Sequence, residues 1–193
     1  MTIAKVDGKL EPISGTERVI PCDTLLISAG LIPENEISLK AGVALNPLTG
    51  GPFVDEKRET NVPGIFAAGN VSHVHDLVDN VAWEGEIAGF YAGAYAKGKL
   101  TPKGRKVEMI AGENIRYVVP NTINTEEAVV LYMRVNEPNN KVSIKVGEVV
   151  EKKMRAVKPS EMVKVDLSPE DLSRIAKGGD DKLTVHCERR RKE

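Results

Sequence analysis

The chain has 193 residues, of which 41% are hydrophobic and 28% are charged, a composition typical of one or two folded domains rather than of a disordered chain. Its 27 basic and 28 acidic residues give a formal net charge of -1, so no overall field favours nucleic acid or an anionic membrane as a partner. The two widely spaced cysteines, Cys22 and Cys187, and the lack of a signal peptide or of an apolar run long enough for a membrane span predict a cytoplasmic protein.

The first thirty residues predict short strands. Residues 2–6 and 18–20 favour strands joined by a turn-rich segment, as in a hairpin. Asp23–Ser28 is a nearly continuous apolar run that ends at Ala29 and Gly30, a pattern typical of a strand buried on both faces. A short helix is expected over residues 35–40.

A second buried strand is predicted over residues 64–68, ending at Gly69 and Asn70. A long helix follows from about Val78 to Lys97. Its glycines recur every fourth residue, at positions 85, 89 and 93, and leave a stripe without side chains that another backbone or a sheet can approach closely. Charged residues such as Glu84 and Glu86 indicate a helix packed on a sheet in water rather than in a bilayer.

The polar segment at residues 97–104 contains glycine and proline and predicts a domain boundary. Beyond it, turn residues separate strand-like runs at the spacing of a small β-sandwich, and Ser168 followed by Pro169 predicts the start of one short helix. The strand-like runs cover residues 107–111, 115–119, 128–135, 141–146, 149–156, 162–167 and 183–187. We therefore expect a small antiparallel β-sandwich, of the immunoglobulin-like kind, over residues 105–193.

Two motifs give the chain a resemblance to a known family. The segments Cys22–Pro33 and Thr60–Asn70, followed by the glycine-spaced helix, resemble the last third of the pyridine nucleotide-disulfide oxidoreductases. The resemblance covers residues 1 to about 98. It implies the C-terminal portion of a Rossmann-like FAD/NAD(P)-binding domain, so the expected fold class is α/β followed by all-β.

The resemblance also implies cofactor-binding positions. In the family the residue matching Asn70 is usually an aspartate that binds the ribityl chain of FAD, and Asn70 keeps hydrogen-bonding capacity without the charge. Free N–H groups at the start of the long helix would face the flavin, where the positive end of the helix dipole stabilises the anionic reduced ring. The expected cofactor-binding residues are Ala29, Gly30, Gly69, Asn70, Val78, Asp79, Asn80 and Val81. No catalytic residue is predicted.

The glycine-rich turns G-x-G-x-x-G that seat FAD and NAD(P)H in a complete member do not occur in this sequence. We therefore expect a C-terminal fragment or subunit of a flavoprotein that passes hydride from NAD(P)H through FAD to an unidentified acceptor, inactive alone. Its partners would be the missing N-terminal FAD/NAD(P)H domains or a separate subunit carrying them, and a homo-oligomer is possible. The alternatives are a non-catalytic interaction module, and a subunit that completes an FAD site with a separate chain.

His73, His75 and Asp76 offer imidazole and carboxylate groups at alternating positions, which is one way to hold zinc. Sequence alone shows no third firm ligand, so no metal site is predicted. A polar loop beside the flavin or at the domain surface is the favoured interpretation. In a complete enzyme, one of these histidines could instead move protons on the substrate side of the flavin.

Overall fold

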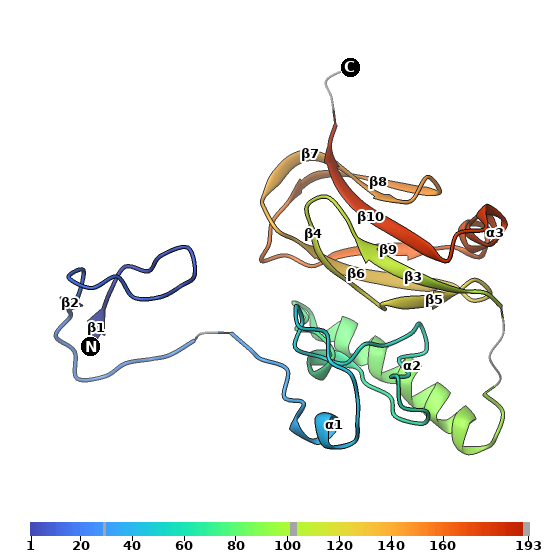
Figure 1. The fold of residues 1–193 in the computed structure, drawn as a ribbon, viewed down its shortest axis with the longest axis horizontal. Coiled ribbons are helices and arrows are strands. Elements are labelled where there is room, and N and C mark those ends of the chain that lie inside the picture. Colours follow the sequence, from blue (N-terminus) through green and yellow to red (C-terminus); the bar gives the residue numbers. More distant parts are fainter. Residues whose placement is uncertain (29, 101–103, 191–193) are drawn as a thin grey trace. The chain divides into compact units, whose positions relative to one another are not determined.

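The computed structural model describes residues 1–28, 30–100 and 104–190, and the chain divides into two units, Met1–Gly30 and Leu31–Glu193. In the first unit, β1 (Thr2–Ile3) pairs antiparallel with β2 (Arg18–Val19), drawn in dark blue in Figure 1. The predicted hairpin is confirmed, with shorter strands. Its loop is held by the Asp7 carboxylate, which accepts hydrogen bonds from the backbone N–H groups of Lys9 and Glu11.

The buried strand predicted over Asp23–Ser28 is wrong for this structure. These residues form no strand, and their apolar side chains are open to solvent, with Leu26 91% and Ile27 74% exposed. A strand that is apolar on both faces needs neighbours on its edges and covering layers above and below. No other described part of the unit Met1–Gly30 supplies them, so within this unit the run is extended and exposed.

In the second unit, α1 (Glu36–Lys40) is followed by loops, the 3-10 turn η1 (Gly69–Val71) and α2 (Val78–Ala96). The two predicted helices are confirmed to within two residues. The strand expected over residues 64–68 is reduced to one bridge between Glu59 and Phe66, flanked by hydrogen bonds from Ala67 to Arg58 and from Thr60 to Ile65. This bridge places Arg58 on the segment antiparallel to the one that leads into η1.

Two sheets form the β-rich part of the second unit. One has the order β5-β3-β10-β7-β8 and the other the order β4-β6-β9. Apart from the parallel pair of β3 and β10, the strand pairs described here are antiparallel. The strands are β3 (Lys106–Ala111), β4 (Ile115–Val119), β5 (Thr122–Asn124), β6 (Val129–Val135), β7 (Asn139–Val146), β8 (Val150–Val157), β9 (Val163–Leu167) and β10 (Lys182–Arg189). The immunoglobulin-like assignment stays a prediction.

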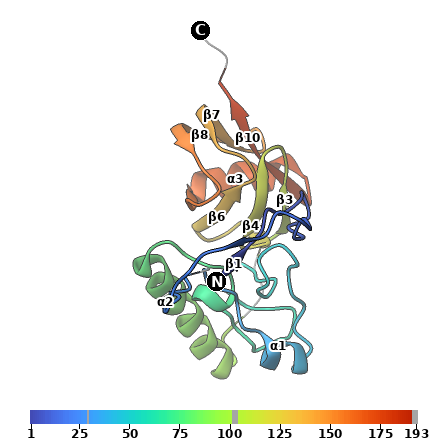
Figure 2. The same cartoon turned by 90° about the vertical axis from the view of Figure 1, so that its left-hand side faces the viewer.

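Both sheets contribute to one apolar core. Alternate residues of β10, such as Leu183, Val185 and Cys187, are buried, as the two-residue period of a strand with one covered face requires. The helix α3 (Pro169–Gly178) adds Leu172 and Ile175 to the same core and lies beside the strands, apart from α2, in both views (Figure 1, Figure 2). Residues 106–189 thus have an apolar core of their own.

Within the described parts of the chain, no helix has the combined length and apolarity that crossing a membrane requires.

Candidate functional site

The turn η1 follows the predicted strand end and packs tightly against α2. Gly69 has φ of +70°, and a Cβ added there would lie 2.8 Å from Val81 Cγ1. The backbone N–H of Gly69 donates to Glu84 Oε2 over 2.8 Å. The next residue, Asn70, is exposed, and its Oδ1 accepts from the backbone N–H of His75 at 3.1 Å. A close approach of backbone to helix therefore presents the Asn70 amide at the surface.

The start of α2 offers free backbone donors beside this turn. Leu77 precedes the helix in an extended conformation and supplies no side-chain cap, while the N–H of Asn80 donates to the Leu77 carbonyl. Val78 and Asp79 are exposed, and Asn80 and Val81 are half-buried. Uncapped N–H groups at a helix start carry a partial positive charge that favours an anionic ligand.

The structure brings six of the eight predicted cofactor positions together. Gly69, Asn70 and residues 78–81 lie on η1 and the first turn of α2, with Gly69 directly against Val81. Gly30 is exposed with φ of +89° and belongs to the first unit. Ala29 lies outside the described residues.

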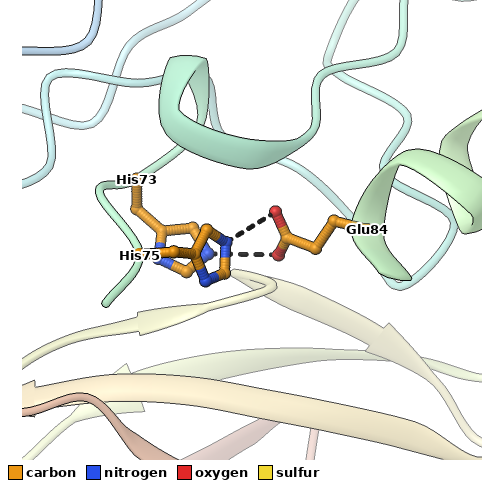
Figure 3. Close-up of side chains that lie close together, drawn as sticks. All are labelled: His73, His75 and Glu84. Atoms are coloured by element: carbon orange, nitrogen blue, oxygen red, sulfur yellow. Dashed lines mark hydrogen bonds and ion pairs between the residues drawn. The ribbon is translucent and has the colours of Figure 1, made fainter. Parts of the chain in front are cut away.

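A buried cluster of titratable side chains lies directly beneath the turn. His73 and His75, from the segment after η1, point at the carboxylate of Glu84 on α2 (Figure 3). His73 Nε2 lies 3.1 Å from Glu84 Oε1, and His75 Nε2 lies 3.0 Å from Oε2. The Arg58 guanidinium is 3.2 Å from Oε1, and all four side chains are almost completely removed from solvent.

Burial and pairing act in opposite directions on these groups. Burial raises the pKa of Glu84, but contacts with the two histidines and the charge of Arg58 outweigh it, so the pKa falls well below its usual range. Burial lowers the pKa of His73 more than the neighbouring carboxylate raises it. The cluster thus holds a buried carboxylate anion, a guanidinium cation and a neutral His73 at neutral pH.

The surface alternative for His73 and His75 is wrong, because both side chains are fully buried, while a position beside the flavin stays a prediction. Sequence reasoning did not find the third member of the cluster, the acidic residue Glu84. Asp76, the carboxylate adjacent in sequence, points elsewhere and pairs with Arg134 on β6. A detectable signal for Glu84 was present, since it and Glu86 are the acidic residues in the interior of a largely apolar and glycine-rich helix.

Comparison with known proteins agrees with the motifs. Residues 1–85 match the family described as pyridine nucleotide-disulphide oxidoreductase. This part of the chain is therefore similar to that family. Over 100 residues the chain is 37% identical to a ferredoxin–NADP reductase of Ignicoccus hospitalis, an alignment that covers 49% of this chain and 32% of the reductase.

Other known proteins show the same partial overlap. A thioredoxin reductase of Listeria monocytogenes is 38% identical over 69 residues, covering 35% of this chain and 21% of that protein. An NAD(P)H sulfur oxidoreductase (CoA-dependent) of Pyrococcus furiosus is 27% identical over 121 residues, covering 58% and 24%. The chain thus spans about a third or less of the length of these relatives. No solved structure matches it significantly.

Proposed function

We propose that this chain supplies the C-terminal part of the FAD-binding domain of an NAD(P)H-dependent flavoprotein oxidoreductase. It would act together with sequence that carries the glycine-rich phosphate-binding turns, either as the missing N-terminal domains or as a separate subunit. The observation that carries the proposal is the Gly69–Asn70 turn packed against the uncapped start of α2, within the segment that matches the family.

The residues at this turn fit a flavin dinucleotide. Asn70 is exposed and keeps its two amide N–H donors available for the hydroxyls of a ribityl chain, although its Oδ1 is engaged by His75. The free N–H groups of Val78 and Asp79 would face the pyrimidine edge of the flavin and favour negative charge on it. FAD, when bound, supplies the hydride acceptor for NAD(P)H, and these residues orient and polarise it.

Two bare apolar surfaces support the need for further sequence. The extended run at Leu25, Leu26 and Ile27 is exposed, and it is the first motif of the family resemblance. On α2, a Cβ added at Gly85, Gly89 or Gly93 would meet nothing within 4 Å, and Phe90 is 71% exposed. Surfaces of this kind are covered in stable proteins, and partner strands of a doubly wound sheet would cover both.

The remaining assignments belong to the same proposal. Residues 1–98 would be the nucleotide-binding portion and residues 105–193 a separate β-domain that covers the oxidoreductase body or contacts a subunit. An apolar core built from residues 107–187 supports that division, and a smaller cluster of Val54, Ala67, Tyr117 and Val119 packs the two portions together. We also propose a cytoplasmic location.

Flavin retention tests the proposal directly. The purified chain is mixed with excess FAD, alone and together with a family polypeptide that carries the G-x-G-x-x-G turns, and visible absorption is recorded after unbound flavin is removed. We expect retained flavin bands at least in the mixture. Asn70→Ala should weaken FAD binding roughly tenfold, the value of one hydrogen bond to the ligand. The control Asn140→Ala alters an exposed asparagine on β7 and should change nothing.

Flavin retention that is equal in the wild type and in Asn70→Ala would contradict the assignment of the binding turn. A chain that retains no flavin in either setting would contradict the proposed function as a whole.

A further inference from the structure

The buried cluster of His73, His75 and Glu84, beneath the Gly69–Asn70 turn, has the composition of a metal site. Two imidazole nitrogens and one carboxylate are the ligand set that proteins use for zinc and for non-haem iron, with the remaining positions open to water or substrate. The ligand atoms of His73, His75 and Glu84 all lie within 4.8 Å of one another. Metal–ligand bonds of about 2.0 to 2.1 Å place tetrahedral ligand atoms roughly 3.3 Å apart. The separations of 3.0 and 3.1 Å between histidine nitrogens and carboxylate oxygens are close to that value.

The contact between His75 and Glu84 is close but poorly aligned as a hydrogen bond. His75 Nε2 lies 3.0 Å from Glu84 Oε2, yet it has no hydrogen-bond partner within the described residues. A ring nitrogen that lies this close to a carboxylate oxygen, but is poorly aligned with it as a donor, is placed where both atoms could bind one ion. Such an ion would hold the two atoms at this separation through two bonds.

Glu84 is already oriented by neighbours of the kind that support ligands. Arg58 Nη2 contacts Oε1 at 3.2 Å, and the Gly69 N–H donates to Oε2 at 2.8 Å. Each carboxylate oxygen has two lone pairs, so both oxygens keep capacity for an ion. Ligating carboxylates in proteins are themselves hydrogen-bonded, and such second partners fix their direction.

Polar atoms without partners gather in the same place. Among the described residues, buried side-chain atoms that lack a hydrogen bond include His75 Nε2, both Nδ1 atoms of His73 and His75, the Tyr132 hydroxyl and two nitrogens of Arg58. The Tyr132 ring packs against both imidazoles, with centroids 5.6 and 5.1 Å away. Leaving several buried polar groups unpaired is costly, so a bound species with its own water ligands is the simplest way to satisfy them.

A cavity lies next to the cluster. A cavity of about 340 Å³ has His73, Tyr117 and Arg134 in its wall. The imidazoles themselves are fully buried, so an ion would pass from this cavity to the cluster only when the side chains between them move.

We propose that His73, His75 and Glu84 bind one divalent transition-metal ion of the zinc class, with Arg58 as a positioning residue for the carboxylate. Zn²⁺ suits three nitrogen and oxygen ligands and one open position, whereas Mg²⁺ and Ca²⁺ require mostly oxygen ligands. The site lies on α2 and the segment that precedes it. The hydrogen bond from the Gly69 N–H to Glu84 connects the metal ligand to the Gly69–Asn70 turn. The proposal does not depend on flavin binding by this chain.

The test measures metal binding by the whole 193-residue chain. The protein is stripped with a chelator, and Zn²⁺ is titrated in competition with a chromophoric indicator. We expect about one equivalent bound, with an apparent Kd at or below roughly 1 µM. Co²⁺ should give visible d–d bands of a four- or five-coordinate site. Mg²⁺ should neither compete nor raise the melting temperature, while Zn²⁺ should raise it, because a ligand of the folded state stabilises that state.

Three variants locate the site. His75→Asn and Glu84→Gln should each weaken Zn²⁺ binding more than roughly 100-fold, since even outer-shell changes cost 10- to 100-fold. His186→Asn is the matched control: it removes the third histidine of the chain, which lies on β10 outside the cluster, and should bind as the wild type does. Circular dichroism reports whether each variant folds.

A direct readout on the unmodified chain covers the case in which a variant fails to fold. On addition of Zn²⁺, the ring-nitrogen resonances of His73 and His75 should shift in nitrogen-15 spectra, while those of His186 stay in place. The proposal is overturned if the wild type binds no stoichiometric Zn²⁺, if His186 is the residue that responds, or if binding survives both His75→Asn and Glu84→Gln. The cluster is then a closed ion-pair network centred on Arg58 and Glu84.

Discussion

Arg58 Nη2 lies 3.2 Å from Glu84 Oε1, and the two side chains are 2% and 0% exposed. The pair links the loop between α1 and η1 to the first half of α2, so it joins two segments that are far apart in the sequence. A buried ion pair of this kind contributes little net free energy compared with an apolar pair, but removing one partner leaves an uncompensated buried charge.

Arg58→Met should therefore be strongly destabilising. We expect a loss of about 3 to 5 kcal/mol in the free energy of unfolding, measured by urea denaturation with chelator present. The double variant Arg58→Met/Glu84→Leu should recover part of that loss, because neither charge is then left alone. The control Lys158→Met removes one partner of an exposed pair with Glu161 and should leave the urea midpoint unchanged. Equal effects of the two single variants would contradict the special role of the buried pair.

Two glycines should respond to alanine in opposite directions. A Cβ at Gly51 would lie 1.7 Å from the carbonyl oxygen of Ser72, a backbone atom that cannot move aside, so Gly51→Ala should destabilise the chain by about 3 kcal/mol. At Gly89, on the open face of α2, a Cβ meets nothing within 4 Å, and alanine should stabilise the isolated chain by about 1 kcal/mol. Thermal unfolding of both variants measures the difference, and the same sign for both would contradict it.

Gly89→Ala should have a second effect if the glycine stripe of α2 receives a partner sheet. The added methyl would then hold the two backbones apart, so the variant that gains stability alone should lose flavin retention in the mixture with the partner polypeptide. Unchanged retention would show that the stripe faces solvent in the assembled protein as well.

The capping box of α3 should make the free energy of unfolding depend on pH. The Asp171 carboxylate accepts from the N–H and the hydroxyl of Ser168, and these hydrogen bonds lower the pKa of Asp171. Its stabilising effect is present above the unfolded pKa of about 3.9 and is lost as the pH falls through the lower folded pKa. Asp171→Asn should cost roughly 1 kcal/mol at pH 7, and the difference from the wild type should shrink below about pH 4. A difference that does not vary with pH would contradict this assignment.

The β-rich part was largely predictable from sequence because each strand there carries its own alternating pattern and is bounded by turn residues. The run predicted at residues 115–119 coincides with β4, and the others match their strands to within a few residues. β5 was missed because its three residues, Thr122–Asn124, are too few to show a period. The start of α3 was predicted from Ser168 and Pro169, whose capping role depends only on local sequence.

The buried cluster was not predictable in the same way. His73 and His75 are visible as a spaced pair, but their burial and their meeting with Glu84 depend on how η1 turns back onto α2. Arg58 lies in a charged stretch, Asp55–Glu59, where no sequence feature distinguishes it from its charged neighbours. Sequence gives each ligand type, whereas the tertiary fold decides which of them converge.

The bare run at Leu25–Ile27 has a consequence for the chain in solution. An unpaired, extended and apolar segment is a template on which identical segments from other molecules can align edge to edge. Synthesis in excess over a covering partner would then lead to aggregates and to capture by chaperones. Balanced production of the two is accordingly a condition for soluble yield, and light scattering against concentration, with and without co-expression, would make that dependence visible.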